Sequence, residues 1–95
     1  MSTAVERDIL DTAKVMIERN QFDALQSYWS EIQNTEFPHS LDWCVLFQRL
    51  YLHACLRKRQ DIALWFQTDL FPCLDPIQKI ALRQVFPYGR YLLSR

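Results

Sequence analysis

The chain of 95 residues is long enough for one domain with a single core, and its 49% apolar and 23% charged residues exclude a disordered protein. The single glycine argues against β-hairpins, β-sandwiches and glycine-rich phosphate loops, which need glycine at their turns. The net charge of zero combines eight acidic and three basic residues over 1–42 with eight basic and three acidic residues over 43–95, which predicts a charge dipole.

The first two predicted elements are helices. Apolar residues recur at helical spacing over residues 4–19 and again over residues 22–33. Asn20 and Gln21 interrupt the pattern between them, which predicts a short turn. We therefore expect an antiparallel helical hairpin over residues 4–34.

The most apolar stretch, Leu41 to Leu56, predicts a central helix that is covered on most sides. Twelve of its sixteen residues are apolar or aromatic, whereas a surface helix shows one apolar stripe. Asp42, Arg49 and His53 fall within about 40° of one another around the helix axis and form a polar seam. This seam is either a recognition surface or the solvated edge of a helical bundle, and His53 could change its charge near neutral pH.

The ends of the central helix carry charges that the helix dipole favours. Ser40 is the predicted N-cap after a loop over residues 34–39, and Asp42 is placed in the first helical turn. The opposite end carries three consecutive basic residues: Arg57, Lys58 and Arg59. The helix dipole explains these charges, and a docking site for an acidic partner or a nucleic acid is the functional alternative.

The rest of the chain predicts two more helices and a short last segment. A fourth helix over residues 60–71 packs back on the central helix. Asp75 and Pro76 form the clearest start signal, an acidic N-cap followed by proline at the first helical position. Apolar residues recur at helical spacing along this fifth helix: Ile77, Ile80, Ala81 and Val85. Pro87 ends or kinks it, and residues 88–95 form a turn and a last half-buried helical segment.

These elements predict a single all-α domain over residues 1–95, with five helices and a short C-terminal segment. They form an antiparallel bundle or a short α-solenoid around the central buried helix. The parts are the hairpin over 4–34, the central helix and its partner over 40–71, and a C-terminal helix over 75–95. The N-terminus is charged where a signal peptide is apolar, and no run of eighteen apolar residues occurs. We therefore expect a cytoplasmic protein without membrane contact.

An internal similarity relates the two predicted hairpins. A shift of 39 residues aligns Met16–Tyr28 with Cys55–Gln67, and both stretches have the order helix, tight turn, helix. A period near forty residues is typical of α-solenoids, in which each hairpin buries its apolar face on the next one.

The second copy, YLHACLRKRQDIALWF over residues 51–66, resembles the helix pair of an ankyrin repeat. Leu52–Cys55 is similar to the inner helix of that family and Asp61–Ala63 to the start of the outer helix. The sequence departs from the family at the turn, where Lys58 and Arg59 stand in place of a glycine. The resemblance implies protein binding without catalysis.

Catalytic and metal-binding motifs such as HExxH and GxSxG are absent from the sequence. Cys44 and Cys55 are eleven residues apart on one predicted helix, hence about 16 Å apart along its axis, and cannot share a metal ion or a disulfide. Together with Cys73 they are interpreted as structural thiols. We expect no enzyme activity, cofactor, metal site or small-molecule substrate, and a small thiol-dependent enzyme is the second alternative function.

The preferred function is a non-catalytic protein-interaction or assembly module. The candidate partner-binding residues are basic or aromatic and lie in the basic half: Arg49, His53, Arg57, Lys58, Arg59, Tyr88, Arg90 and Tyr91. The first alternative is a nucleic-acid-binding domain that uses the basic residues: Arg49, Arg57, Lys58, Arg59, Arg83 and Arg90.

The partner is another protein or a second copy of the chain. In self-association, the acidic helix over residues 4–19 meets the basic half of another copy, and apolar surface from Tyr88, Tyr91 and Leu92 adds to the contact. The association can close as a two-fold dimer or remain open, head to tail. The alternative is a monomer whose two halves neutralise each other.

Overall fold

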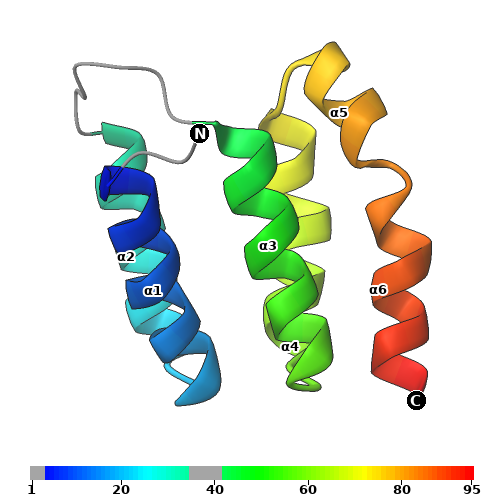
Figure 1. Ribbon diagram of the computed structural model, residues 1–95, viewed down its shortest axis with the longest axis horizontal. Helices are drawn as coiled ribbons and strands as arrows, with labels where there is room; N and C mark the ends of the chain where they lie inside the picture. Colours follow the sequence, from blue (N-terminus) through cyan, green and yellow to red (C-terminus); the bar gives the residue numbers. More distant parts are fainter. Residues whose placement is uncertain (1–3, 35–41) are drawn as a thin grey trace.

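A computed structural model describes residues 4–34 and 42–95 (Figure 1). Its six α-helices are α1 (Ala4–Glu18), α2 (Phe22–Asn34), α3 (Trp43–Leu56), α4 (Gln60–Trp65), α5 (Pro76–Leu82) and α6 (Val85–Ser94). A π-helical turn (Phe66–Leu70) and a 3₁₀ turn (Phe71–Cys73) continue α4 toward α5. The described residues contain no strand, so the predicted all-α class is confirmed for them.

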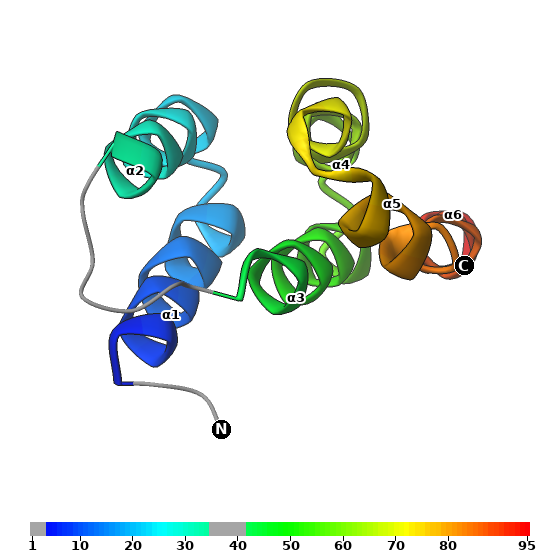
Figure 2. The ribbon, with the colours of Figure 1, turned by 90° about the horizontal axis from the view of Figure 1, so that it is seen from above.

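The helices stand side by side in the order of the chain. Figure 2 shows the pair α1 and α2 at one side, α3 and α4 in the middle, and α5 with α6 at the other side. Helix α3 contacts α1, α4, α5 and α6. The N-terminal pair and α6 therefore occupy opposite ends of the longest dimension, which measures 40 Å (Figure 1).

Aromatic rings from four segments meet in the core. The ring of Phe47 on α3 lies 5.3 Å from that of Phe66 and 6.2 Å from that of Phe86, measured between centroids. The indole of Trp29 on α2 lies 5.5 Å from that of Trp43 and 5.6 Å from the ring of Phe66. All four pairs have the edge-to-face geometry that aromatic quadrupoles favour, so these contacts tie α2, α3, the π-helical turn and α6 together.

The two hairpin turns have the same backbone geometry. Asn20 and Lys58 adopt left-handed φ angles of 56° and 60°, although neither is glycine. The next residues, Gln21 and Arg59, each donate their N–H to the carbonyl five residues earlier at 2.8 Å, as in a Schellman motif. The turns thus correspond at a shift of 38 residues, one fewer than the sequence similarity indicated.

Helix α3 begins one residue after Asp42, which is its N-cap. The Asp42 carboxylate accepts the N–H of Val45 at 3.2 Å, so the prediction that Asp42 lies inside the first turn is wrong. Asn34, the first residue of the predicted loop over 34–39, is the last residue of α2. The rest of that loop and the predicted cap Ser40 lie outside the described residues.

The C-terminal part of the chain also differs from the prediction. The fifth helix ends at Leu82, and the residues after it form a complete helix, α6, in place of a turn and a short segment. Pro87 is the third residue of α6, where its missing N–H removes no intrahelical hydrogen bond. The described residues therefore form six α-helices where five and a short segment were predicted.

The apolar residues of α5 do not all face the core. Ile77 and Ile80 are 80% and 68% exposed, and Ala81 is exposed as well, whereas Leu82 and Val85 are buried. Helix α5 has only seven residues, and its last residue Leu82 is buried, so most of the surface of α5 faces outward.

Within the described ranges, no helix combines the length and the apolar character that crossing a bilayer requires.

Candidate functional site

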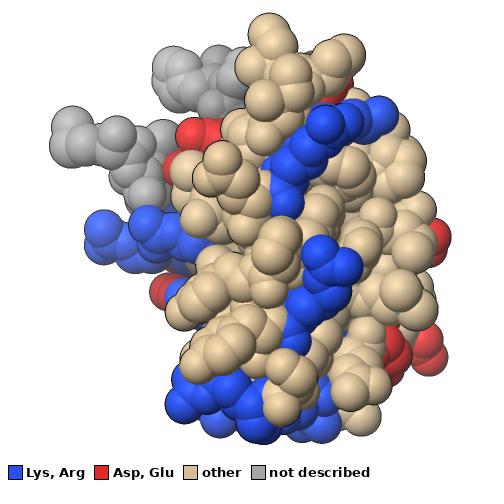
Figure 3. Space-filling model, turned by 90° about the vertical axis from the view of Figure 1, so that its right-hand side faces the viewer, with Lys and Arg blue, Asp and Glu red and all other residues tan. Residues whose placement is uncertain are grey.

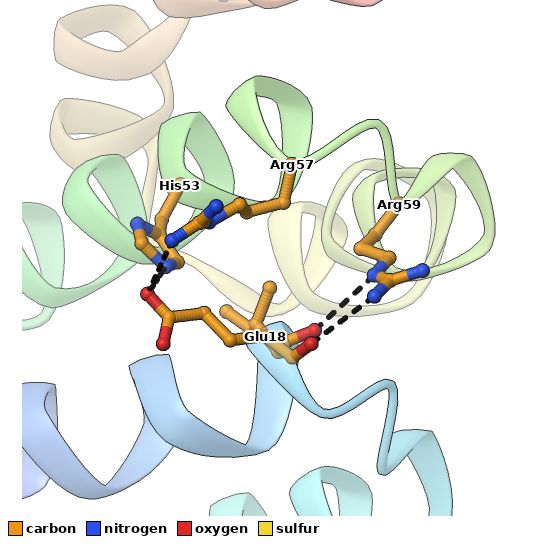
Figure 4. A network of polar contacts seen from close by, with 5 residues as sticks. Glu18, His53, Arg57 and Arg59 are labelled. Carbon is orange, nitrogen blue, oxygen red and sulfur yellow. Dashed lines mark hydrogen bonds and ion pairs between the residues drawn. The ribbon is translucent and has the colours of Figure 1, made fainter.

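Arg59 of the predicted basic run binds within the protein. Its Nε donates to the carbonyl of Ile17 at 3.3 Å, and its Nη2 donates to the carbonyl of Glu18 at 3.1 Å (Figure 4). These carbonyls belong to the last turn of α1, which carries the negative end of the helix dipole. Arg59 therefore joins the second hairpin to the first, and its guanidinium already forms hydrogen bonds within the protein.

Lys58 also holds the end of another helix. Its Nζ donates to the carbonyl of Leu92 and, at 3.1 Å, to that of Arg95, both at the C-terminal end of α6. Two of the three cations in the predicted run thus cap the carbonyl ends of helices that are distant in sequence. Their charges are partly neutralised there, which weakens their interpretation as partner-binding residues.

Glu18 on α1 joins the remaining basic residue to a histidine. Its Oε1 lies 3.0 Å from Nη2 of Arg57 and 3.2 Å from Nε2 of His53 (Figure 4). The contact with His53 has the distance of an ion pair but lacks hydrogen-bond angles. The hydrogen bond from Arg57 is the main cause that lowers the pKa of Glu18. Burial lowers the pKa of His53, assisted by Lys14 and Arg57 and opposed by Glu18.

The polar seam of α3 meets α1 only in part. Leu46 in the middle of the seam is completely buried. At one end, the backbone N–H of Asp42 donates to Oε1 of Glu6 at 3.1 Å, and at the other end the side chain of His53 meets Glu18. Asp42 and Arg49 are exposed. His53 is therefore the seam residue whose side chain lies against α1, whereas Asp42 and Arg49 face solvent.

A groove of about 400 Å³ lies between α1, α3 and α6, and we call it the α1–α3–α6 groove. Its lining residues are Lys14, Arg49, Leu52, His53, Leu56, Tyr88 and Leu92. The groove brings together three predicted partner-binding residues that come from two helices: Arg49, His53 and Tyr88. Sequence reasoning missed Lys14 because it lies in the acidic half. Its position one helical turn before Glu18 was the signal that could have placed it near the same side of α1.

The outer side of α5 and α6 forms a second candidate surface. Residues 76–95 contain four basic residues and no acidic one. Figure 3 shows Lys and Arg side chains across this end of the molecule, with Asp and Glu side chains only at its margins. The predicted residues Tyr88, Arg90 and Tyr91 are exposed here, and the two tyrosine rings stack with their centroids 6.4 Å apart. Leu92 is 4% exposed and cannot contribute the open apolar surface that was predicted.

A third candidate site is a hollow of about 280 Å³ between α2, α3, the segment before α5 and the start of α5. Its lining residues are Trp29, Gln33, Trp43, Phe47, Leu70, Cys73, Leu74 and Gln78. Cys73 is the one titratable residue among them, and its Sγ lies 3.4 Å from the carbonyl of Asp69. The lining therefore offers an apolar surface without an acid–base pair.

The cysteines and the acidic residues form no reactive cluster in the part of the chain that the structure describes. Burial is the main cause that raises the pKa of Cys55 and of Cys44, which keeps both thiols protonated. No three His, Cys, Asp or Glu side chains of the described residues converge as metal ligands do.

In comparisons with known proteins, no family model, no curated protein and no solved structure matches the chain. The similarity of residues 51–66 to an ankyrin repeat thus stays a prediction.

Proposed function

We propose that the protein is a non-catalytic interaction module that binds an acidic, amphipathic segment of another protein in the α1–α3–α6 groove. The observation that carries the proposal is the combination of two cations with apolar side chains in one groove. Lys14 and Arg49 provide the positive charge, and Leu52 and Leu56 provide apolar surface in the same groove.

The chemistry of the groove selects for both charge and apolar surface in a partner. Leu56 is 56% exposed and therefore offers open apolar surface beside the cations of the groove. Tyr88 adds an aromatic side chain of the type that contributes strongly to protein interfaces. Because burial lowers the pKa of His53, this residue is neutral at pH 7, and the attraction for carboxylates comes from Lys14 and Arg49.

The arrangement of the helices supports an interaction module as well. Two hairpins with the same left-handed turn, at Asn20 and at Lys58, stand side by side as the units of a helical repeat do. Helical-repeat proteins commonly bind other proteins along the surface that successive hairpins form. We therefore propose that the two hairpins are units of a helical repeat.

Nucleic-acid binding is the alternative that a specific observation favours. Residues 76–95 combine four basic residues with the stacked rings of Tyr88 and Tyr91, and cations with stacked aromatic rings suit a single-stranded nucleic acid. The internal contacts of Lys58 and Arg59 argue against it, because they engage two of the cations that this alternative needs. Affinity for a single-stranded oligonucleotide that falls steeply with salt on logarithmic axes would favour this alternative.

Selection from a displayed library of short random peptides tests the proposed function. Peptides are selected on the wild-type protein and counter-selected on the Lys14→Glu/Arg49→Glu variant. We expect the enriched sequences to combine Asp or Glu with large apolar residues at helical spacing. Fluorescence polarisation should then show that Arg49→Glu weakens binding of these peptides by about tenfold or more.

Lys79→Glu is the matched control, because it makes the same charge change on α5, outside the groove. It should leave peptide affinity nearly unchanged. Enriched peptides without acidic residues would contradict the proposal. An equal loss of peptide affinity in Arg49→Glu and Lys79→Glu would contradict it as well.

A further inference from the structure

The outer side of α1 is an acidic and partly apolar stripe. Asp8 and Asp11 are exposed one turn apart, and neither forms an ion pair with another described residue. Val5 and Val15 lie close to them on the helix and are 41% and 42% exposed. This stripe is opposite the side of α1 that is buried against α2 and α3.

The outer side of α5 and α6 has the complementary character. Arg83 and Arg90 are exposed, and they form no ion pair with other residues in the described ranges. Ile80 and Tyr91 are 68% and 58% exposed. Cations and large apolar side chains thus occur together here, as carboxylates and valines do on α1.

The fold places these two surfaces at opposite ends of the molecule. Helices α1 and α2 stand at one end of the 40 Å dimension and α6 stands at the other (Figures 1 and 2). Residues 4–34 hold six acidic and three basic residues, whereas residues 42–95 hold four acidic and eight basic ones. The charge dipole predicted from the sequence therefore runs along the length of the molecule.

We infer that the protein associates with itself head to tail, the acidic outer side of α1 in one copy contacting the basic outer side of α5 and α6 in the next. The contact joins different surfaces of the two copies, so each copy keeps one free acidic and one free basic surface. The association therefore grows beyond a dimer, as an open chain of copies or as a ring. Exposed ion pairs alone bind weakly, so the exposed valines, Ile80 and Tyr91 supply the apolar part of the contact.

This inference goes beyond the proposed function, because its surfaces differ from the cationic part of the groove. The two can be tested separately. Arg49→Glu should weaken peptide binding in the groove by about tenfold or more and leave self-association unchanged. Loss of both properties in that one variant would show that the groove, and not the outer side of α5 and α6, is the contact between copies, and would overturn the inference.

Analytical ultracentrifugation of the full chain gives the first test. At low salt the weight-average sedimentation coefficient of the wild type should rise continuously with concentration, and high salt should reduce this rise. A monomer at low salt and high concentration would overturn the inference. A dimer that does not grow further would also overturn it, because it indicates a closed contact.

Two variants then test the acidic outer side of α1 and the basic outer side of α5 and α6 separately. An acidic-end variant carries Asp8→Asn, Asp11→Asn and Val15→Ser, and a basic-end variant carries Arg83→Gln, Arg90→Gln and Tyr91→Ser. All six positions are exposed, so both variants should keep the helical circular dichroism of the wild type.

Each variant alone should be monomeric, since it lacks one of the two ends. An equimolar mixture should form a one-to-one dimer and nothing larger, because the intact basic end of the first variant meets the intact acidic end of the second. A mixture that stays monomeric, or a single variant that still assembles, would show that the assigned surfaces are wrong.

Discussion

Gly89 of α6 lies directly against the ring of Tyr51 on α3. A Cβ atom built at Gly89 would stand 2.4 Å from Cε2 and 2.7 Å from Oη of Tyr51, closer than real side chains approach. The absence of a side chain at position 89 therefore lets α6 approach α3. Burial of the side chain is the main cause that raises the pKa of the Tyr51 phenol.

Gly89→Ala should destabilise the protein, although alanine normally stabilises a helix by about 1 kcal/mol relative to glycine. Overpacking against Tyr51 should cost about 1–3 kcal/mol and outweigh that gain. Urea unfolding followed by circular dichroism measures the net change. The cost should shrink when Gly89→Ala is combined with Tyr51→Leu, because the ring is then gone. A stabilising Gly89→Ala variant would contradict the close contact.

Arg59 should contribute more to stability than Arg57, although the two are close in sequence. Arg59→Ala removes two charge-assisted hydrogen bonds to the last carbonyls of α1 and should cost about 1–2 kcal/mol. Arg57→Ala is the control and should change little, because the Arg57 side chain is 53% exposed and its ion pair is screened by water. Arg59→Lys should not restore stability, since one ammonium group cannot reproduce the fork of the guanidinium. Equal unfolding free energies for the two alanine variants would count against this assignment.

The left-handed turn at Lys58 should reverse the usual order of glycine and alanine. Lys58→Gly and Lys58→Ala both lose the amine that binds the end of α6, so they differ only in backbone preference. The glycine variant should be the more stable by about 1 kcal/mol, because alanine is strained at a φ of 60°. The same order is expected at Asn20, whose φ is 56°. Thermal unfolding of each pair measures the difference, and a more stable alanine variant at either site would contradict the turn geometry.

Acidification should destabilise the protein through His53. Its pKa is lowered from the ordinary value of 6.5, chiefly by burial, so the unfolded chain binds a proton more readily than the folded one. The stability that neutral His53 provides is complete above about pH 6.5 and is lost as the pH falls toward the folded-state pKa. Glu18, whose pKa is lowered from 4.5, adds a decline of the same sign at more acidic pH.

The measurement is the free energy of unfolding in urea at a series of pH values. His53→Gln should flatten the decline that begins near pH 6.5, while the second histidine, His39, is present in both proteins and cancels in the comparison. If the free energy of unfolding fell equally with pH in the wild type and in His53→Gln, the folded protein would not disfavour protonation of His53.

Local signals predicted much of the helical structure. Apolar periodicity predicted α1 and α2 over nearly their full lengths, and the acid and proline at Asp75 and Pro76 predicted the start of α5, where Asp75 and Gln78 form a capping box. These features depend on residues within one or two turns of each other. They can therefore be read without knowledge of the partner helix.

The same local signals failed where a distant contact decided the outcome. Pro87 and Gly89 usually interrupt a helix, yet both lie inside α6. Pro87 lies in the first turn, and Gly89 is required by the ring of Tyr51, which is 38 residues away in the sequence. The core-facing pattern of Ile77 and Ile80 failed for a related reason, because no helix of the described residues covers that side of α5.

The sequence by itself determined the helical class, the main helix starts and the opposite charges of the two halves, because composition, periodicity and caps act locally. Only the tertiary structure decided which charges a partner can reach. Lys58 and Arg59 bind the ends of α6 and α1, and His53 of the polar seam lies against Glu18. Lys14 and Arg49, far apart in sequence, meet in one groove. The physical reason is that the availability of a charge depends on which helix end or side chain lies beside it, and packing between distant helices sets this.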